Sequence, residues 1–319
     1  MSAARKAKVA PRENVGVIGL GIMGSAMSAN LVKAGFDVIG FDTVPARRAA
    51  LARSGGRPAK SAAEVGRRAA IVITSLPSSD ALAAVSAQLA GAARPGLLVI
   101  ETSTLPIEVK EAARKLLAAR RVTVLDCPLS GTGAQARNKD LAVFASGEPA
   151  AYRRCAPVFE GFSRVHYLVG KFGDGSKMKY IANLLVAIHN VAAAEAMVLG
   201  MKAGLDPAKI LKVVSSGAGN SRMLEVRGPM MVKGDYSDAT MKVEVWQKDM
   251  KIIGEYARSI DCPTPLFLAS APIYTAAMAM GRGKEDTASV CAVLEESARV
   301  ARRRGARRKI RMTPTRRSQ

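Results

Sequence analysis

A glycine-rich turn near the start of the chain restricts the possible fold more than any other feature. The stretch "VGVIGLGIMGSAMSANLVKAG" places Gly19, Gly21 and Gly24 directly after an apolar run and at the start of a helical pattern that Gly35 ends. In such a turn the first glycine permits a tight bend, the second lets a ligand approach the backbone, and the third lets helix and strand pack closely. The helix that follows directs its free amides at an anion. The turn therefore predicts a strand-turn-helix unit that binds the pyrophosphate of a dinucleotide.

An acidic residue at the end of the next apolar run bears on which dinucleotide is bound. That run, "DVIGFD", ends in Asp42, 18 residues after Gly24. A carboxylate at this place accepts hydrogen bonds from the ribose hydroxyls of NAD and repels the 2′-phosphate of NADP. Arg47 and Arg48 follow, and an arginine there could instead bind that phosphate. We therefore expect NAD as the cofactor, with NADP as the alternative. A glycine turn that only closes a strand-helix unit is the structural alternative to both.

Short aliphatic runs separated by helix-length segments continue through the first half of the chain. Runs rich in Val, Ile and Leu throughout are typical of parallel strands that are buried on both faces. The fold class is therefore expected to be α/β, with an N-terminal doubly wound, mostly parallel sheet of the Rossmann type. The runs that predict its strands begin at residues 15, 36, 69, 96, 121, 141 and 164.

The pattern changes after Gly175, where apolar residues recur at helical spacing and strand-like runs cease. The first of these segments predicts one helix of about 27 residues, ended by Gly204, which is long for a globular domain. Asp206 and Pro207 then provide the N-cap and first position of another helix. We expect an all-α C-terminal domain, with further helices over residues 219–232, 238–260, 265–281 and 285–303.

The charge of the chain is concentrated at its two ends. Residues 1–14 and 299–319 together carry +13 of the net charge of +22. We expect a solvated tail there, or one that binds polyanions nonspecifically, and no specific binding of nucleic acid. The expected segments are a disordered basic leader over 1–14, an NAD(P)-binding Rossmann domain over 15–174, an all-α substrate and oligomerisation domain over 175–299, and a disordered basic tail over 300–319.

Composition also bears on the compartment of the protein. Polar residues such as Asn183, Asn190 and Glu195 interrupt the longest apolar stretch, so no membrane-spanning helix is expected. The leader lacks the apolar segment of a secretory signal. The four cysteines have no metal-binding spacing, and only two histidines occur, so we expect no metal site. A cytoplasmic location fits these features best.

Small hydroxyl side chains and glycines follow three of the expected strands. The segments "SLPSSD" at 75–80, "ETSTLP" at 101–106 and "DCPLSGTGAQA" at 126–136 lie at the carboxyl edge of the sheet, where open α/β sheets bind ligands. In the third segment, residues 130–133 bring hydroxyls and successive amides together, which suits a substrate carboxylate. Ordinary turn and loop chemistry is the alternative for each segment.

The start of the long helix carries a candidate for proton transfer. Lys179, Asn183 and Asn190 lie within about 40° of one another around the helix, whereas Lys177 points roughly 160° away from Lys179. A desolvated lysine has a lowered pKa and can donate or accept a proton near neutral pH. Combined with hydride transfer by a nicotinamide, this would interconvert an alcohol and a carbonyl compound. A lysine in a solvated first turn is the alternative.

These motifs together resemble the β-hydroxyacid dehydrogenases, the family of 3-hydroxyisobutyrate dehydrogenase, tartronate semialdehyde reductase and the glyoxylate/succinic semialdehyde reductases. The resemblance covers residues 15–298 and rests on "GLGIMGSAMSANL", "DCPLSGTGAQA", "GDGSKMKYIANLL" and "WQKDMKI", in that order. It implies NAD(P)-dependent interconversion of a small hydroxy acid and its semialdehyde or keto acid. It also implies a homodimer or homotetramer with the active site in the cleft between the two domains.

The resemblance implies a role for individual residues. Lys179 would be the catalytic lysine and Asn183 its hydrogen-bonding helper. Ser130, Gly131 and the amide of Thr132 would hold the substrate carboxylate. The residues that would contact the cofactor are Gly19, Leu20, Gly21, Ile22, Met23, Gly24, Asp42, Leu76, Pro77, Thr104 and Lys248.

The sequence departs from the family pattern at three positions. Thr132 replaces the second glycine of the substrate loop, and Leu184 replaces the second asparagine of the catalytic motif. Arg222 stands where a large aromatic residue is common. An extra cation favours a second carboxylate or a phosphate on the substrate, although Arg222 could equally be a surface residue. These departures leave the identity of the substrate open.

Two other functions compete with this interpretation. Imine reductases share the resemblance in fold but usually lack the lysine found here at Lys179. A non-catalytic nucleotide-binding module, tethered to polyanions by the basic tails, would have no need of Lys179, Asn183 and Ser130. These residues favour a hydroxyacid dehydrogenase, and the other two functions are kept as alternatives.

Overall fold

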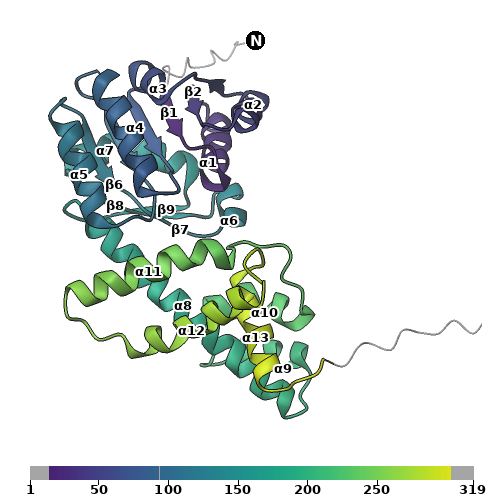
Figure 1. The fold of residues 1–319 in the computed structure, drawn as a ribbon. Coiled ribbons are helices and arrows are strands. Elements are labelled where there is room, and N and C mark those ends of the chain that lie inside the picture. The colour runs from purple at the N-terminus through teal and green to yellow at the C-terminus, as the bar shows by residue number, and fades with distance from the viewer. Residues whose placement is uncertain (1–13, 93, 303–319) are drawn as a thin grey trace, which may run out of the picture.

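The computed structural model describes residues 14–92 and 94–302, which form a nucleotide-binding domain followed by a helical domain (Figure 1). The predicted basic leader, apart from Asn14, lies outside the described residues. The same holds for the predicted basic tail from residue 303 onward.

The first domain is built on a single twisted sheet whose strands run mostly parallel, as predicted. In the described part of the chain the strand order is β3-β2-β1-β4-β5-β6-β8-β7, and β9 pairs with β8. The pairs from β3 to β6 are all parallel, whereas β8 runs antiparallel to β6 and β7. The strands are β1 Val15–Ile18, β2 Val38–Phe41, β3 Arg57–Pro58, β4 Ile71–Thr74, β5 Leu98–Glu101, β6 Thr123–Asp126, β7 Leu129–Ser130, β8 Ala142–Ser146 and β9 Val165–Gly170.

Helices cover both faces of this sheet, which explains why its central strands β1, β4 and β5 are buried throughout. On one face Leu31 and Phe159 pack against the strands, and on the other Val65 and Leu89 do so. The helices of the first face are α1 Ile22–Lys33, α2 Pro45–Arg53, α6 Gly133–Arg137 and α7 Pro149–Phe162; those of the second are α3 Ala62–Arg68, α4 Ser79–Ala92 and α5 Ile107–Ala118 (Figure 1).

The second domain is all-α in its described residues, as predicted, and is built around the long helix α8. This helix starts against β6, β7 and β8 of the sheet and then packs against α10, α11, α12 and α13 (Figure 1). The helices are α8 Asp174–Lys202, α9 Pro207–Val214, α10 Arg222–Lys233, α11 Val243–Ser259, α12 Pro265–Ala279 and α13 Val290–Ser297, with a 3-10 turn, η1, at Thr287–Ser289.

The helix predicted over residues 285–303 is shorter than expected, and the chain beyond it is anchored rather than free. It ends at Ser297, because Arg299 adopts a left-handed conformation with φ 51°. Arg302 then donates to Glu295 through Nε at 2.9 Å and to the backbone oxygen of Met231 at 2.6 Å. Ordered contacts therefore extend to Arg302, beyond the predicted domain end at residue 299.

By length and composition alone, α8 could cross a membrane. Its polar side chains have partners within the helical domain, however. The Asn190 amide donates to the hydroxyl of Tyr274 at 3.0 Å and to the backbone oxygen of Thr287 at 2.9 Å. The apolar character of α8 therefore accompanies its place at the centre of this domain.

Candidate functional site

The glycine turn has the geometry that the sequence predicts. Gly19 has φ 90°, and a Cβ there would lie 2.1 Å from the backbone oxygen of Ser75. A Cβ on Gly24 would lie 1.8 Å from the backbone oxygen of Gly19. A Cβ on Gly21, in contrast, would meet no atom within 4 Å. Two glycines are thus required by the close packing of the protein itself, while the third faces open space.

That open space suits the pyrophosphate of a dinucleotide. Gly21 is the N-cap of α1 and provides no side-chain cap. Within the described part of the chain, the amides of Ile22, Met23 and Gly24 have no hydrogen-bond partner. Free amides at a helix N-terminus bind anions. The residues present therefore fit an NAD(P) cofactor at this turn.

Asp42 lies beside the turn and is fixed by it. Its Oδ2 accepts a hydrogen bond from the Leu20 amide at 2.8 Å, and its Oδ1 accepts one from the Val44 amide at 2.8 Å. Arg47 approaches Oδ2 at 3.3 Å. Burial alone would raise the pKa of Asp42, but these two amides and Arg47 outweigh it and lower the pKa. The carboxylate is therefore charged where the ribose of a cofactor would lie.

The remaining predicted cofactor residues lie on neighbouring strand ends. The side chain of Leu76 approaches Gly19, and Pro77 is exposed just before α4. The Lys248 ammonium, on α11, donates to the backbone oxygen of Thr104 at 2.7 Å. Lys248 thus joins the helical domain to the carboxyl edge of the sheet.

A cavity of about 250 Å³ brings the predicted substrate and catalytic residues together. Ser130, Gly131 and Thr132 line it from the nucleotide-binding domain, and Lys179 and Asn183 line it from α8. The cavity lies close to the cofactor turn, because Ile22 packs directly on Gly133 of the same loop. A substrate of a few carbon atoms could lie between the loop, the lysine and the cofactor.

Lys179 has an ammonium without a hydrogen bond or ion pair among the described residues. Part of its side chain is exposed to the cavity. Burial of the ammonium lowers the pKa of Lys179, an effect that nearby Asp249 opposes and Lys248 reinforces. Lys177, by contrast, pairs with Asp174 at 2.9 Å, and this pairing raises its pKa. Lys179 thus faces the cavity and Lys177 does not, as their positions around the helix predict.

Asn183 is held by an acidic residue whose role the sequence analysis missed. The Asn183 amide donates to Asp249 Oδ2 at 2.9 Å, and both side chains are buried. Burial raises the pKa of Asp249, although Lys248, Lys179 and Asn183 act in the opposite direction. Asp249 follows Lys248 in the motif "WQKDMKI", but only the packing of α11 against α8 brings it to the catalytic helix.

The substrate loop contains a hydrogen-bonding pattern that the sequence analysis did not foresee. The hydroxyl of Thr132 accepts from the Gln135 amide at 3.3 Å, and the Thr132 amide donates to Gln135 Oε1 at 3.0 Å. This capping box starts α6. The Thr132 amide, predicted to bind the substrate carboxylate, is therefore engaged with Gln135, and it would have to share or leave that bond to hold an anion.

Arg222 lines the same cavity from the first position of α10. It pairs with Glu225 at 2.9 Å, and its side chain is 66% exposed. Arg164, also on the cavity, pairs with Asp140 at 2.7 Å. Arg227 is turned to buried Asp286 at 3.2 Å. Arg222 is thus a cation at the cavity with only an exposed partner.

The described residues contain no cluster of three or more His, Cys, Asp or Glu side chains that could hold a metal ion.

Comparison with known families divides the chain where the structure does. The profile described as the NAD binding domain of 6-phosphogluconate dehydrogenase matches residues 14–170. The family described as "NAD-binding of NADP-dependent 3-hydroxyisobutyrate dehydrogenase" matches residues 173–294. The two matches meet between β9 and α8, where the nucleotide-binding domain gives way to the helical one.

Individual relatives extend over nearly the whole chain. The L-threonate dehydrogenase of Cupriavidus necator is 37% identical over 87% of this chain and 94% of its own length. The crystal structure of a 3-hydroxyisobutyrate dehydrogenase from Salmonella typhimurium superposes with a TM-score of 0.81, at 31% identity, and covers 88% of this chain and 100% of its own.

An imine reductase from a Pseudomonas species superposes less well, with a TM-score of 0.60 at 21% identity over 89% of this chain and 99% of its own, which shows a common fold only. The two family matches and the long alignments with dehydrogenases favour the dehydrogenases over the imine reductases. The chain belongs to the β-hydroxyacid dehydrogenase family, the NAD(P)-dependent oxidoreductases of small hydroxy acids.

Proposed function

We propose that Lys179 exchanges a proton with the substrate in this enzyme, as hydroxy acid and semialdehyde or keto acid interconvert. The observation that carries the proposal is the ammonium of Lys179, which has a lowered pKa and no partner among the described residues, in the same cavity as Ser130 and Gly131. Bound NAD(P) would supply or accept the hydride. Each direction then needs one group that takes up or gives the hydroxyl proton, and Lys179 can do both.

The other residues of the cavity would orient the substrate for this transfer. Ser130 and Gly131 bind its carboxylate in the cavity that Lys179 also lines. Asn183 lies one helical turn from Lys179, and a hydrogen bond to Asp249 fixes its side chain. During oxidation the hydroxyl proton passes to the neutral lysine, and during reduction the charged lysine returns it to the oxygen. Orientation of this kind supplies much of the rate enhancement in such sites.

We propose NAD as the preferred cofactor. The charged carboxylate of Asp42 beside the turn supports this proposal, because it favours free ribose hydroxyls over a 2′-phosphate. Arg47 pairs with the Asp42 carboxylate at 3.3 Å, and Arg48 donates to the backbone oxygen of Asp42.

A screen of the purified enzyme with both cofactors tests the reaction and the cofactor together. The panel comprises L-threonate and 3-hydroxyisobutyrate for oxidation, and glyoxylate, succinic semialdehyde, methylmalonate semialdehyde and tartronate semialdehyde for reduction. L-Threonate comes first, because the relative from Cupriavidus necator carries that name. Turnover of at least one pair, faster with NAD than with NADP, is expected. A protein that binds NADH but turns over nothing would contradict the proposal.

A substrate with a second anionic group would bind Arg222. Arg222→Gln is expected to raise KM for a hydroxy acid with two carboxylates, such as 2-(hydroxymethyl)glutarate, by about tenfold, since a hydrogen bond to a charged group is worth about 1.5–3 kcal/mol. KM for L-threonate, which has one carboxylate, should be unchanged. Arg258→Gln, at an exposed arginine of α11, is the matched control. Equal changes in KM for both classes of substrate would place Arg222 outside the substrate contacts.

We propose that the enzyme is a homodimer or homotetramer in the cytoplasm. One side of α8 exposes Met178, Ile181 and Leu185 at helical spacing, with Ile181 56% exposed. An apolar stripe of this kind suits burial against a second copy. Among the described residues the cysteines form no disulfide, which suits a reducing compartment. Light scattering on the purified chain tests the assembly, and a monomeric mass would contradict it.

A further inference from the structure

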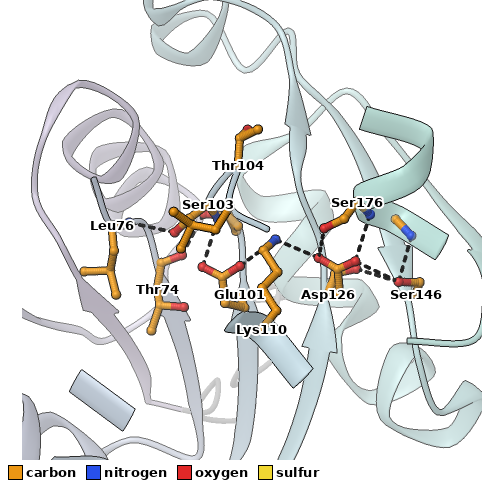
Figure 2. A network of polar contacts seen from close by, with 12 residues as sticks. Thr74, Leu76, Glu101, Ser103, Thr104, Lys110, Asp126, Ser146 and Ser176 are labelled. Carbon is orange, nitrogen blue, oxygen red and sulfur yellow. Dashed lines mark hydrogen bonds and ion pairs between the residues drawn. The ribbon is translucent and has the colours of Figure 1, made fainter. Parts of the chain in front are cut away.

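The first turn of the helix that carries Lys179 is capped by the neighbouring domain rather than by its own sequence. Its N-cap, Gly173, has φ 94° and no side chain to satisfy the first amides. Instead, the Gly175 amide donates to Ser146 Oγ at 2.9 Å, and the Ser176 amide donates to Asp126 Oδ2 at 2.8 Å. The Ser176 hydroxyl also donates to Asp126 Oδ1 at 2.9 Å. Strands β6 and β8 thus supply the caps that α8 lacks (Figure 2).

The capping carboxylate is itself fixed by a buried ion cluster. The Lys110 ammonium lies 2.8 Å from Asp126 Oδ1 and 2.7 Å from Glu101 Oε2. All three side chains are at most 2% exposed. Burial lowers the pKa of Lys110, but the two carboxylates outweigh it and raise the pKa well above its ordinary value. Lys110 is therefore charged, and its ion pair with Asp126 holds that side chain at the N-terminus of α8.

The same cluster reaches the strand ends that border the proposed cofactor site. Glu101 Oε1 accepts from the Ser103 amide at 3.0 Å, and Ser103 Oγ accepts from the Leu76 amide at 2.8 Å. Figure 2 shows this continuous line of contacts from Leu76, through Glu101, Lys110 and Asp126, to the start of α8. The loops beside the cofactor and the first turn of α8 are thus tied to one buried group of charges.

Close packing fixes the helix against the sheet at the same point. A Cβ on Gly175 would lie 2.3 Å from the backbone oxygen of Phe144 and 2.7 Å from that of Asp126. Lys179 follows Gly175 by one helical turn. A shift of α8 along or around its axis would therefore move the Lys179 ammonium relative to the cofactor loops.

We propose that Glu101, Lys110, Asp126, Ser146 and Ser176, here termed the capping network, position Lys179 against the cofactor. This inference rests on the proposed function, because it assigns Lys179 the proton transfer. None of the residues of the network lines the cavity that contains Lys179. They act through α8. The cap sets where the helix begins, and Glu101 fixes the loops beside the cofactor site relative to that first turn. Displacement of a reacting group by about 1 Å can cost a hundredfold in rate.

The test compares Ser176→Ala with Ser163→Ala. The first removes the hydroxyl bond to Asp126 but leaves the amide bond in place. The second removes an equally buried serine that bonds the backbone oxygen of Phe159 at 2.8 Å, outside the capping network. Three quantities are measured in each variant: kcat, the dissociation constant of NADH by fluorescence titration, and the pH at which the rate changes as Lys179 titrates.

Ser176→Ala is expected to lower kcat about tenfold or more while NADH binding changes less than about threefold. Its pH inflection is expected to move up toward that of an ordinary lysine, because a displaced ammonium regains water. Ser163→Ala is expected to keep both kcat and the inflection, even if its melting temperature falls equally. Equal kcat and equal inflections in the two variants would overturn the inference.

A second measurement covers the carboxylate. In Asp126→Asn, hydrogen exchange at the amide of Ser176 is expected to accelerate relative to amides of α12, since its acceptor is weakened. Unchanged exchange there would also overturn the inference. If Asp126→Asn fails to fold, the Ser176→Ala comparison stands by itself. Lys179→Ala separates the two levels: if it retains turnover, the proposed function fails, whereas if only Ser176→Ala retains turnover, the positioning role fails.

Discussion

Replacing Lys179 with alanine is expected to lower kcat by about a hundredfold or more in both directions, because a positioned acid or base contributes about 10²–10⁴ to the rate. The dissociation constant of NADH should change little, since the free amides of the glycine turn and Asp42 do not contact Lys179. Steady-state rates and a fluorescence titration check both parts. A variant that keeps its turnover within about tenfold would remove Lys179 from the chemistry.

Lys177→Ala is the matched control for this prediction. Lys177 lies two residues away on the same helix, but its ammonium pairs with Asp174 on the partly exposed side of the first turn. Loss of an exposed ion pair costs little, typically about 0–1 kcal/mol. Lys177→Ala should therefore keep kcat close to that of the wild type. An equal loss of rate in both variants would indicate a general effect on α8 rather than proton transfer.

Gly21→Ala is expected to weaken NADH binding by at least about tenfold, which corresponds to about 1.4 kcal/mol, without unfolding the protein. The added methyl group would meet no protein atom within 4 Å but would occupy the space that the pyrophosphate must approach. The free energy of unfolding should stay within about 1 kcal/mol of the wild type. A fluorescence titration and a chemical denaturation curve measure the two quantities.

Gly24→Ala provides the contrast, because there the methyl group would lie 1.8 Å from the backbone oxygen of Gly19. Overpacking of this kind costs about 1–3 kcal/mol, and backbone contacts cannot relax as a flexible side chain does. Gly24→Ala should therefore lose stability as well as cofactor binding. If Gly21→Ala bound NADH as tightly as the wild type, the cofactor could not approach the turn as proposed.

The features that the sequence predicts well are those that a local pattern determines. The turn at Gly19 and the long helix α8 follow from glycine placement and apolar periodicity within a few turns of chain. The two-residue strands β3 and β7 escape prediction, because they are too short to show any period. The last helix ends early because Arg299 adopts a left-handed conformation, which the presence of an arginine does not predict.

The residues of the candidate site likewise fall into those that a local pattern predicts and those that only packing brings together. Helical phase alone separates Lys179 from Lys177, since both lie on one regular helix. Asp249 cannot be paired with Asn183 from the sequence, because the two side chains are 66 residues apart and meet only through packing. Lys110 gives no signal either: an isolated lysine in an amphipathic helix is usually exposed, and only the carboxylates of β5 and β6 explain its burial.

The pH dependence of each direction has a definite sign. Burial lowers the pKa of Lys179 from its ordinary value. Oxidation needs the neutral amine as base, so kcat/KM should fall as the pH drops below this pKa. Reduction needs the charged ammonium as acid, so kcat/KM should fall as the pH rises above it. Both inflections should be absent in Lys179→Ala.

The most direct test of the central claim is rescue of Lys179→Ala by small primary amines. With a hydroxy acid from the panel and NAD, added methylamine or ethylamine should restore oxidation in proportion to its concentration. Among amines of similar size, the rate should rise with the basicity of the amine, as expected for general base catalysis. If the variant binds NADH like the wild type but no amine of the series restores its rate, Lys179 is not the group that exchanges the proton.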